Sequence, residues 1–170
     1  MDIQDFIRDI PDFPKPGILF KDITPLLSNH EALVGCANRL AKLSPDNVKI
    51  DKVIGIESRG FIIGSMIAER LEAGFVPVRK KGKLPYQVKS KDYGLEYGKD
   101  TLEIHVDAIK KGEKVLIHDD VLATGGTAEA VCNLVEELGG EVVQCNFIME
   151  LDFLNGRDKL NSPVSSLLSY

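Results

Sequence analysis

The stretch VLIHDDVLATGGTAEA, residues 115–130, indicates both the fold of the chain and the position of its candidate functional residues. An apolar, β-branched run leads to two adjacent carboxylates, Asp119 and Asp120, and a turn of small residues then opens a segment with helical spacing. We predict a buried strand over 114–118, a helix over 126–138 and a second strand after it. Such a unit implies a parallel crossover, so both acids lie where parallel strands end and ligand crevices form.

The turn over residues 123–127 predicts an anion site. Its small residues let backbone N–H groups approach an anion closely, and the next helix adds unpaired donors and the positive end of its dipole. A phosphate suits these donors. The two aspartates would repel it unless they face sugar hydroxyls or a magnesium ion, so a phosphorylated sugar with a metal-bound second phosphate fits both halves of the stretch.

A plainer interpretation of the same residues stays open at this point. In it, Gly125 and Gly126 only permit a tight turn between strand and helix, and the aspartates cap that turn. The stretch is neither a nucleoside-triphosphate loop nor a dinucleotide fingerprint, because no Gly-Lys-Ser/Thr follows and the glycines are adjacent.

A second unit of this kind occupies residues 52–78. It has an apolar run at 53–56, a turn at 57–60, a helical segment to about Leu71 and a strand at 75–78. Continuous β-branched runs suit strands that are covered on both faces. The sequence therefore predicts an α/β fold with a mainly parallel central sheet flanked by helices.

Two less regular regions lie outside these units. Residues 1 to about 45 hold a short helix, a proline-rich segment and an amphipathic helix near 31–43, which we expect to cap one edge of the sheet. About residues 79–106 are rich in glycine, proline and lysine, and the alternation near 102–106 predicts a loop with a hairpin. With a closing C-terminal strand and tail, we treat residues 1–170 as a single domain.

Composition excludes several classes of protein. The formal net charge of −5 argues against a general nucleic-acid or membrane-surface binder, because such proteins need positive charge to neutralise phosphate. The acidic, proline-interrupted start predicts no signal peptide, and no apolar run approaches the roughly 18 residues of a membrane span. We expect a cytoplasmic protein whose cysteines, Cys36, Cys132 and Cys145, are reduced core residues.

The residues quoted first also carry a family resemblance. VLIHDDVLATGGTA, residues 115–128, resembles the phosphoribosyl-pyrophosphate signature of the type I phosphoribosyltransferases, which is a hydrophobic run, two acids and a Thr-Gly-Gly-Thr loop. Three further stretches resemble the adenine-specific members of that family in order and spacing: FPKPGILFKDITPLL at 13–27, ESRGFIIGSMIAERL at 57–71, and VRKKGKLP with LEYGKDTLEI within 78–104. The likeness spans nearly the whole chain, from Phe6 to the tail.

The resemblance implies a fold and a reaction. The type I phosphoribosyltransferase fold adds an N-terminal hood and a flexible lid loop and hairpin, here over about 1–45 and 79–106. The reaction transfers the 5-phosphoribosyl group of phosphoribosyl pyrophosphate to adenine, giving AMP and pyrophosphate in purine salvage. The resemblance also implies a homodimer, with Mg²⁺ bound mainly through the substrate pyrophosphate and with no direct protein ligand expected.

Carried over, the resemblance assigns residues to the phosphoribosyl pyrophosphate. The resemblance implies that the ribose hydroxyls bind Asp119 and Asp120. It implies that the 5-phosphate binds the loop Ala123, Thr124, Gly125, Gly126 and Thr127. The pyrophosphate falls to Ser58, Arg59, Lys80 and Lys83, while Arg79 is implied to reach the neighbouring subunit's site. Without the family, Arg59 is a surface ion pair and the basic run over 79–91 is a solvated loop.

The resemblance also places the base and its acid/base group. Glu96 lies near the purine's imidazole edge, where the N9 proton must leave, and Tyr97 packs at the closing lid. The rival carboxylate Glu103 has strand-like neighbours that suggest an exposed face, so we favour Glu96. The resemblance implies that adenine stacks on Phe20 and contacts the backbone groups around it. The residues that follow the paired acids form the opposite wall of the adenine site. The adenine-site residues are Ile18, Leu19, Phe20, Lys21, Val121 and Leu122, together with Ala123.

Two other functions compete with this one. A hypoxanthine-guanine or xanthine transferase would keep the reaction and change the base. A purine-responsive transcriptional regulator would bind phosphoribosyl pyrophosphate without turnover, but it needs a DNA-binding extension for which the acidic N-terminus and the length leave no room. The histidines His30, His105 and His118 have no visible role.

Overall fold

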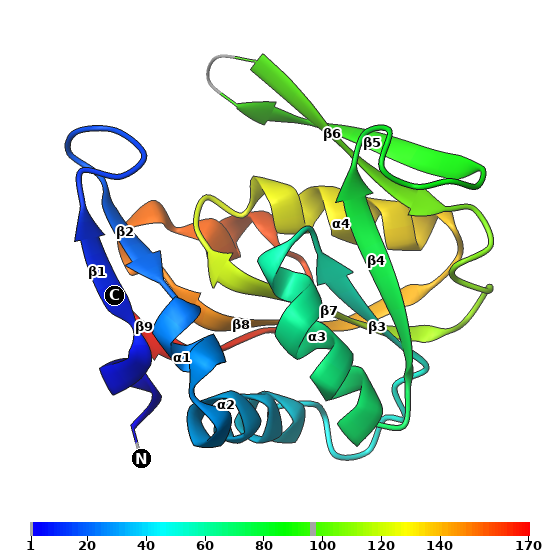
Figure 1. Ribbon diagram of the computed structural model, residues 1–170. Coiled ribbons are helices and arrows are strands. Elements are labelled where there is room, and N and C mark those ends of the chain that lie inside the picture. Colours follow the sequence, from blue (N-terminus) through cyan, green and yellow to red (C-terminus); the bar gives the residue numbers. More distant parts are fainter. Residues whose placement is uncertain (1, 96–97) are drawn as a thin grey trace.

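The computed structural model describes residues 2–95 and 98–170. Its main element is a seven-stranded sheet in the order β5-β6-β4-β3-β7-β8-β9 (Figure 1). The strands are β3 (Lys52–Ile56), β4 (Gly74–Lys80), β5 (Val88–Leu95), β6 (Gly98–His105), β7 (Lys114–Leu122), β8 (Glu141–Glu150) and β9 (Val164–Ser169). Strands β4, β3, β7, β8 and β9 run parallel, whereas β6 is antiparallel to both β4 and β5. The predicted α/β fold with a mainly parallel sheet is confirmed.

Helices cover both faces of this sheet. Helices α2 (His30–Lys42) and α3 (Arg59–Arg70) lie on one face, and α4 (Gly126–Glu137) lies on the other (Figure 1). The strands alternate accordingly: Leu116 packs with the α2 and α3 side chains, and Ile117 packs with those of α4. Because both faces are buried, these strands need apolar residues at successive positions, which is the pattern that predicted them. None of the described helices is both long and apolar enough to cross a membrane.

Strand β7 is longer than the sequence predicted. It continues past His118 to Leu122 and pairs with β8 as far as Glu150, so both aspartates lie within the strand. Parallel pairing with β8 provides the ladder that extends β7, and a pattern based on apolar residues alone does not detect it. The two carboxylates therefore project toward opposite faces of the sheet.

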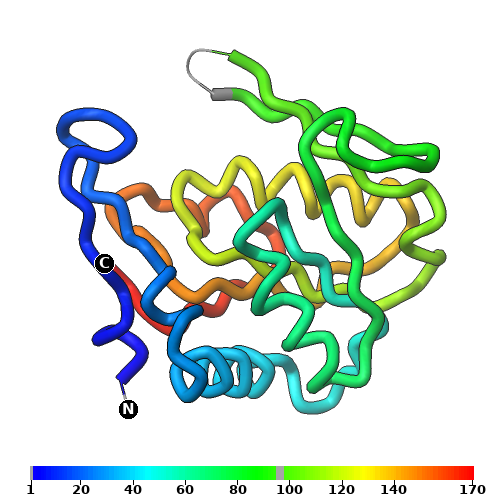
Figure 2. The backbone as a smooth tube through the Cα atoms, in the orientation of Figure 1, coloured from blue at the N-terminus to red at the C-terminus, as the bar shows by residue number. Residues whose placement is uncertain are grey.

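The proline-rich N-terminal segment forms a hairpin that the sequence did not predict. Strands β1 (Arg8–Pro11) and β2 (Leu19–Asp22) pair antiparallel, and the short helix α1 (Thr24–Ser28) follows them. Prolines remove ladder donors and obscure the alternation, which explains why the strands were missed. Figure 2 shows this hairpin in dark blue at the left and the β5–β6 hairpin in green across the top.

The β5–β6 hairpin is docked on α4. Lys89 and Lys91 of β5 both form ion pairs with Glu137 at the end of α4, with N···O distances of 3.2 and 2.8 Å. Tyr93 donates a hydrogen bond of 3.0 Å to Asp100 across the hairpin. Burial, followed by the hydrogen bond to Asp100, raises the pKa of Tyr93 to about 12.

A buried polar pair lies directly beneath the paired acids. The Nδ1 of His118 donates to Oδ1 of Asn146 on β8 at 2.9 Å, and the Asn146 side chain donates to the Leu40 carbonyl at 3.3 Å. His118 and Asn146 are both fully buried. Burial lowers the pKa of His118 to about 4, against the opposing effects of Asn146 and of Asp120.

This pKa predicts an acid-sensitive fold. Below pH 6.5 the unfolded chain protonates His118 while the folded chain does not until about pH 4, so the stability present above pH 6.5 is lost as pH falls through this window. Between pH 7 and pH 5, we expect the free energy of unfolding of the wild type to fall by about 2 kcal/mol more than that of His118→Gln. The glutamine amide keeps a donor for Asn146 but does not titrate. Urea unfolding at both pH values measures this difference, and equal losses would contradict it.

Candidate active site

Two helix N-termini converge at the carboxyl end of the sheet. Strands β3 and β7 are parallel neighbours; β3 leads into α3 on one face, and β7 leads into α4 on the other. This arrangement is a topological switch point, where open α/β sheets bind ligands. Neither helix has a side-chain hydrogen bond at its N-cap, Ser58 or Gly125. No cap side chain therefore occupies the first backbone donors, which can bind anions when unpaired; in α3 the Phe61 N–H already donates to the Ser58 carbonyl at 3.1 Å.

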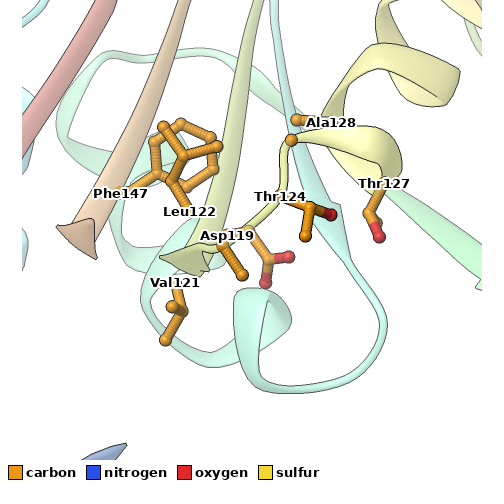
Figure 3. Close-up of a pocket in the computed structure, with 9 residues that line it drawn as sticks. Asp119, Val121, Leu122, Thr124, Thr127, Ala128 and Phe147 are labelled. Carbon is orange, nitrogen blue, oxygen red and sulfur yellow. The ribbon is translucent and has the colours of Figure 1, made fainter. Parts of the chain in front are cut away.

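The turn before α4 forms a small cup. Gly125 has φ +84°, a left-handed conformation that suits glycine and that turns the chain from strand into helix. A cavity of about 70 Å³ lies here, lined by Asp119, Val121, Leu122, Ala123, Thr124, Gly125, Thr127, Ala128 and Phe147. Figure 3 shows the hydroxyls of Thr124 and Thr127 and the carboxylate of Asp119 around one opening. Gly126 is the first residue of α4.

The paired acids have different environments. Asp120 is 3% exposed, and its Oδ2 lies 2.7 Å from Nε of Arg59, the first residue of α3. Asp119 is half-buried at the cavity edge, and its Oδ1 accepts the Asp120 N–H at 2.9 Å. Burial and then the negative charge of Asp120 raise the pKa of Asp119. Asp119 is thus the acid available to a ligand, while Asp120 orients Arg59.

A larger cavity of about 260 Å³ adjoins the cup and shares residues with it. It is lined by Ile18, Leu19, Phe20, Lys21, Arg59, Asp119, Asp120, Val121, Ala123 and Leu151. The guanidinium carbon of Arg59 lies 5.0 Å from the Phe20 ring centroid, a cation–π contact. Phe13 meets the same ring edge-on, with 5.1 Å between centroids. A flat, apolar ligand therefore has an aromatic wall next to the cup.

Most of the residues predicted for the base surround this cavity, with two differences. Leu122 does not line it; its side chain is 2% exposed and packs in the core, because β7 continues to this residue. The ammonium of Lys21 points to Asp9, at 2.7 Å, and lies over the Tyr170 ring. Leu151 was missed, although the predicted parallel pairing of β7 with the next strand would have placed the end of that strand beside the acids.

The basic run over 79–91 does not converge on these cavities in this structure. Arg79 donates to Glu57 of its own chain and lies over the Phe61 ring, while the Lys80 ammonium pairs with Asp100 at 3.2 Å. Burial opposes ionisation of Glu57, but the Lys80 N–H and Arg79 hold its pKa below the ordinary value. Neither Lys80 nor Lys83 lines either cavity.

The expected exposure of Glu103 is wrong. It is 6% exposed and accepts hydrogen bonds from the Gly82 N–H at 3.0 Å and from the Ser90 hydroxyl at 3.4 Å. The loop that contains Gly82 covers this part of β6. The alternation of residues within the strand gives no sign of that cover. Glu96 and Tyr97 lie outside the described residues. Within residues 2–95 and 98–170, no group of three or more His, Cys, Asp or Glu side chains is placed to hold a metal ion.

Comparisons with known proteins agree with this geometry. Residues 22–164 match the family model of the phosphoribosyl transferase domain. The chain is 63% identical to the adenine phosphoribosyltransferase of Flavobacterium johnsoniae, covering 100% of both chains. It also resembles the crystal structure of adenine phosphoribosyltransferase from Rhodothermus marinus, with a TM-score of 0.93, 56% identity, and coverage of 99% of this chain and 96% of that one.

A yeast structure extends the likeness. The adenine phosphoribosyltransferase of Saccharomyces cerevisiae, complexed with an imino-altritol bisphosphate and adenine, matches with a TM-score of 0.91 and 46% identity, over 98% of this chain and 96% of that one. The sheet order, the switch-point cup and these full-length similarities all agree. The chain belongs to the phosphoribosyl transferase domain family and, within it, to the adenine phosphoribosyltransferases.

Proposed function

We propose that this protein transfers the 5-phosphoribosyl group of phosphoribosyl pyrophosphate to adenine, giving AMP and pyrophosphate. The observation that carries the proposal is the meeting of two uncapped helix N-termini, one free carboxylate and an aromatic-walled cavity at a single switch point. Each part matches one part of the substrates: anion, ribose hydroxyl and purine. The structure of the Trypanosoma brucei relative is described as a complex with AMP, pyrophosphate and ribose-5-phosphate, which supports the same ligand set.

The phosphate groups divide between the two helices. We assign the ribose 5-phosphate to the 123–127 loop and the ribose hydroxyls to the acids, chiefly Asp119. The pyrophosphate falls to Ser58 and Arg59. Because Nε of Arg59 already contacts Asp120, its two Nη groups remain as a fork for the leaving group. Binding both ends of the sugar holds the anomeric carbon in a fixed position beside the base.

The chemical step then needs one proton transfer. The N9 lone pair of adenine forms the bond to the anomeric carbon, the carbon–oxygen bond breaks with its electrons leaving on pyrophosphate, and the N9 proton passes to the carboxylate that we assign to Glu96. Charge develops on the departing pyrophosphate, so the Arg59 fork and the lid lysines Lys80 and Lys83 stabilise the transition state. Closure of the lid would bring these lysines in and exclude water from the electrophilic carbon.

Magnesium fits this site as a substrate-bound ion. The Oδ2 of Asp120 contacts Arg59, and Asp119 is the one of the two acids that lines the cup, where its Oδ1 accepts a backbone N–H. A single carboxylate suits Mg²⁺, which keeps waters and prefers phosphate oxygens. When bound, the ion neutralises pyrophosphate charge.

The homodimer and the cytoplasmic location are proposals as well. Ile62 on α3 is 43% exposed and Tyr86 in the loop before β5 is 56% exposed, so these apolar side chains offer surface that a second subunit would cover. In the dimer, we assign Arg79 to the partner's site, which requires it to leave Glu57. Sedimentation velocity tests the assembly, and a monomer at assay concentration would refute it.

A competition assay tests the reaction and the base together. Adenine, hypoxanthine, guanine and xanthine are offered with magnesium and phosphoribosyl pyrophosphate, and the nucleotide products are identified. We expect AMP alone, because a pocket that pairs with a 6-amino edge leaves buried polar groups unpaired against 6-oxo bases, worth about 10⁴-fold in selectivity. IMP, GMP or XMP would overturn the base assignment, and no product would favour the non-catalytic binder.

The aromatic wall yields a separate prediction. Phe20→Ala is expected to raise KM for adenine roughly 10- to 100-fold, because stacking of a base on an aromatic ring is worth about 1–3 kcal/mol. The KM for phosphoribosyl pyrophosphate should change little. Phe153→Ala is the matched control, since Phe153 is 72% exposed and lines neither cavity. An unchanged adenine KM in Phe20→Ala would remove Phe20 from the base site.

A further inference from the structure

The phosphate loop is supported from behind by a segment that lines neither the cup nor the base cavity. Gly156 begins η3 (Gly156–Lys159), after β8, and is buried. A Cβ built on Gly156 would lie 2.4 Å from the Ala123 carbonyl oxygen and 3.0 Å from the Leu122 side chain. Conversely, a Cβ on Gly125 would lie 2.4 Å from the Gly156 carbonyl oxygen. The two backbones therefore touch with no room for a side chain on either.

The contact between Gly156 and Gly125 lies at the residue that sets the conformation of the loop. Gly125 is the left-handed N-cap of α4, so its backbone angles set the direction in which the first N–H groups of the helix point. No side-chain cap holds it there. The Gly156 carbonyl packs against one side of Gly125, while the other side of the loop lines the cup. Tertiary packing thus fixes the position of Gly125, while the first N–H groups of the helix keep no cap side chain as an acceptor.

The supporting turn is itself anchored to the sheet. The Nε of Arg157 donates to both carboxylate oxygens of Glu150, the last residue of β8, at 2.7 and 2.9 Å. The Nη1 of Arg157 donates to the Val164 carbonyl at 2.8 Å, and the Ser166 hydroxyl donates to Glu150 at 2.8 Å. Glu150 is 7% exposed, whereas the Arg157 side chain is 46% exposed, so the guanidinium covers the carboxylate from the solvent side. It holds the turn to strands β8 and β9.

We infer that the turn 155–157 is a positioning element for the ribose-5-phosphate loop, with Gly156 as its contact residue and the Arg157–Glu150 pair as its anchor. The inference rests on the proposed function, which gives this loop its phosphate. Residues 155–157 line neither the cup nor the adenine cavity, whose wall includes β2 residues and Arg59. Loss of the turn should therefore weaken binding of the phosphorylated sugar far more than binding of free adenine, since Ala123 is the one residue of the 123–127 loop that also lines the adenine cavity.

The primary test is Gly156→Ala. The added methyl would push Ala123 and Gly125 out of place, and we expect KM for phosphoribosyl pyrophosphate and Kd for AMP to rise about 10- to 100-fold, with Kd for adenine within about threefold of wild type. Gly140→Ala is the matched control. Its Cβ would meet Ile109 at 2.6 Å and Val135 at 2.9 Å, beyond the opposite end of α4, so it should lower Tm while KM for phosphoribosyl pyrophosphate stays unchanged.

A second variant keeps the inference testable if Gly156→Ala does not fold. Arg157→Lys keeps the charge but loses the fork to Glu150, and we expect a rise of about 3- to 10-fold in the Kd for AMP. Wild-type AMP affinity in a folded variant, or equal losses of AMP and adenine affinity, would overturn the positioning role. AMP binding is measured without turnover, so it tests the positioning role independently of the reaction. Failure of the wild-type protein to make AMP from adenine and phosphoribosyl pyrophosphate would refute the proposed function instead.

Discussion

Replacing Arg59 with glutamine is expected to lower kcat/KM for phosphoribosyl pyrophosphate by roughly 10³-fold. The substitution removes the guanidinium fork that we assign to the leaving pyrophosphate, and loss of one such preorganised donor typically costs about 10²–10³ in rate. It also leaves Asp120, which is 3% exposed, without the cation at 2.7 Å. An unpaired buried carboxylate next to the substrate phosphates repels them, so the two losses add.

Steady-state kinetics with both substrates measure this effect, and two variants control it. Arg59→Lys keeps a positive charge for Asp120 but cannot form the fork, so it should recover only part of the loss. Arg70→Gln removes an arginine from the opposite end of α3, where it pairs with Glu69, and should leave the kinetics unchanged. If Arg59→Gln lowered Tm but not kcat/KM, Arg59 would be a structural ion-pair partner only.

Glu96→Gln is expected to lower kcat by about 10²- to 10⁴-fold with KM for adenine changed only a few-fold, the signature of an interaction made mainly in the transition state. The expectation comes from the family resemblance of the stretch LEYGKDTLEI, since Glu96 lies outside the described residues. A carboxylate that accepts the N9 proton should also leave an acid limb in the pH profile of kcat, which the glutamine variant should lose.

The neighbouring carboxylate provides the control. Glu103→Gln keeps a carbonyl oxygen that accepts from the Gly82 N–H, and its NH2 group can donate to the Ser90 hydroxyl oxygen, so the loop before β5 should stay in place and kcat should stay close to wild type. Unchanged kcat in Glu96→Gln would remove that residue from the acid/base role. A large loss of kcat in Glu103→Gln alone would transfer the role to Glu103.

Several parts of the fold were predictable because their signals are local. The two strand–helix–strand units follow from continuous apolar runs, small-residue turns and helical spacing, and the observed bounds of α3 and α4 lie within one or two residues of the prediction. The cup before α4 follows from glycine and threonine at the start of a helix. In contrast, the β1–β2 hairpin was missed because prolines mask its alternation, and β7 was predicted too short because pairing with β8 extends it.

The site divides in the same way. Residues close together in the chain were enough to predict the sheet type, the location of Asp119 and Asp120 near the carboxyl end of a parallel strand, and the small-residue loop that we assign to the phosphate. The tertiary structure was needed to show that Asp120 pairs with Arg59, that Leu151 lines the larger cavity while Leu122 does not, and that Gly156 packs against Gly125. Each of these contacts joins segments far apart in the chain, and the order of strands in the sheet, which local patterns do not encode, brings them together.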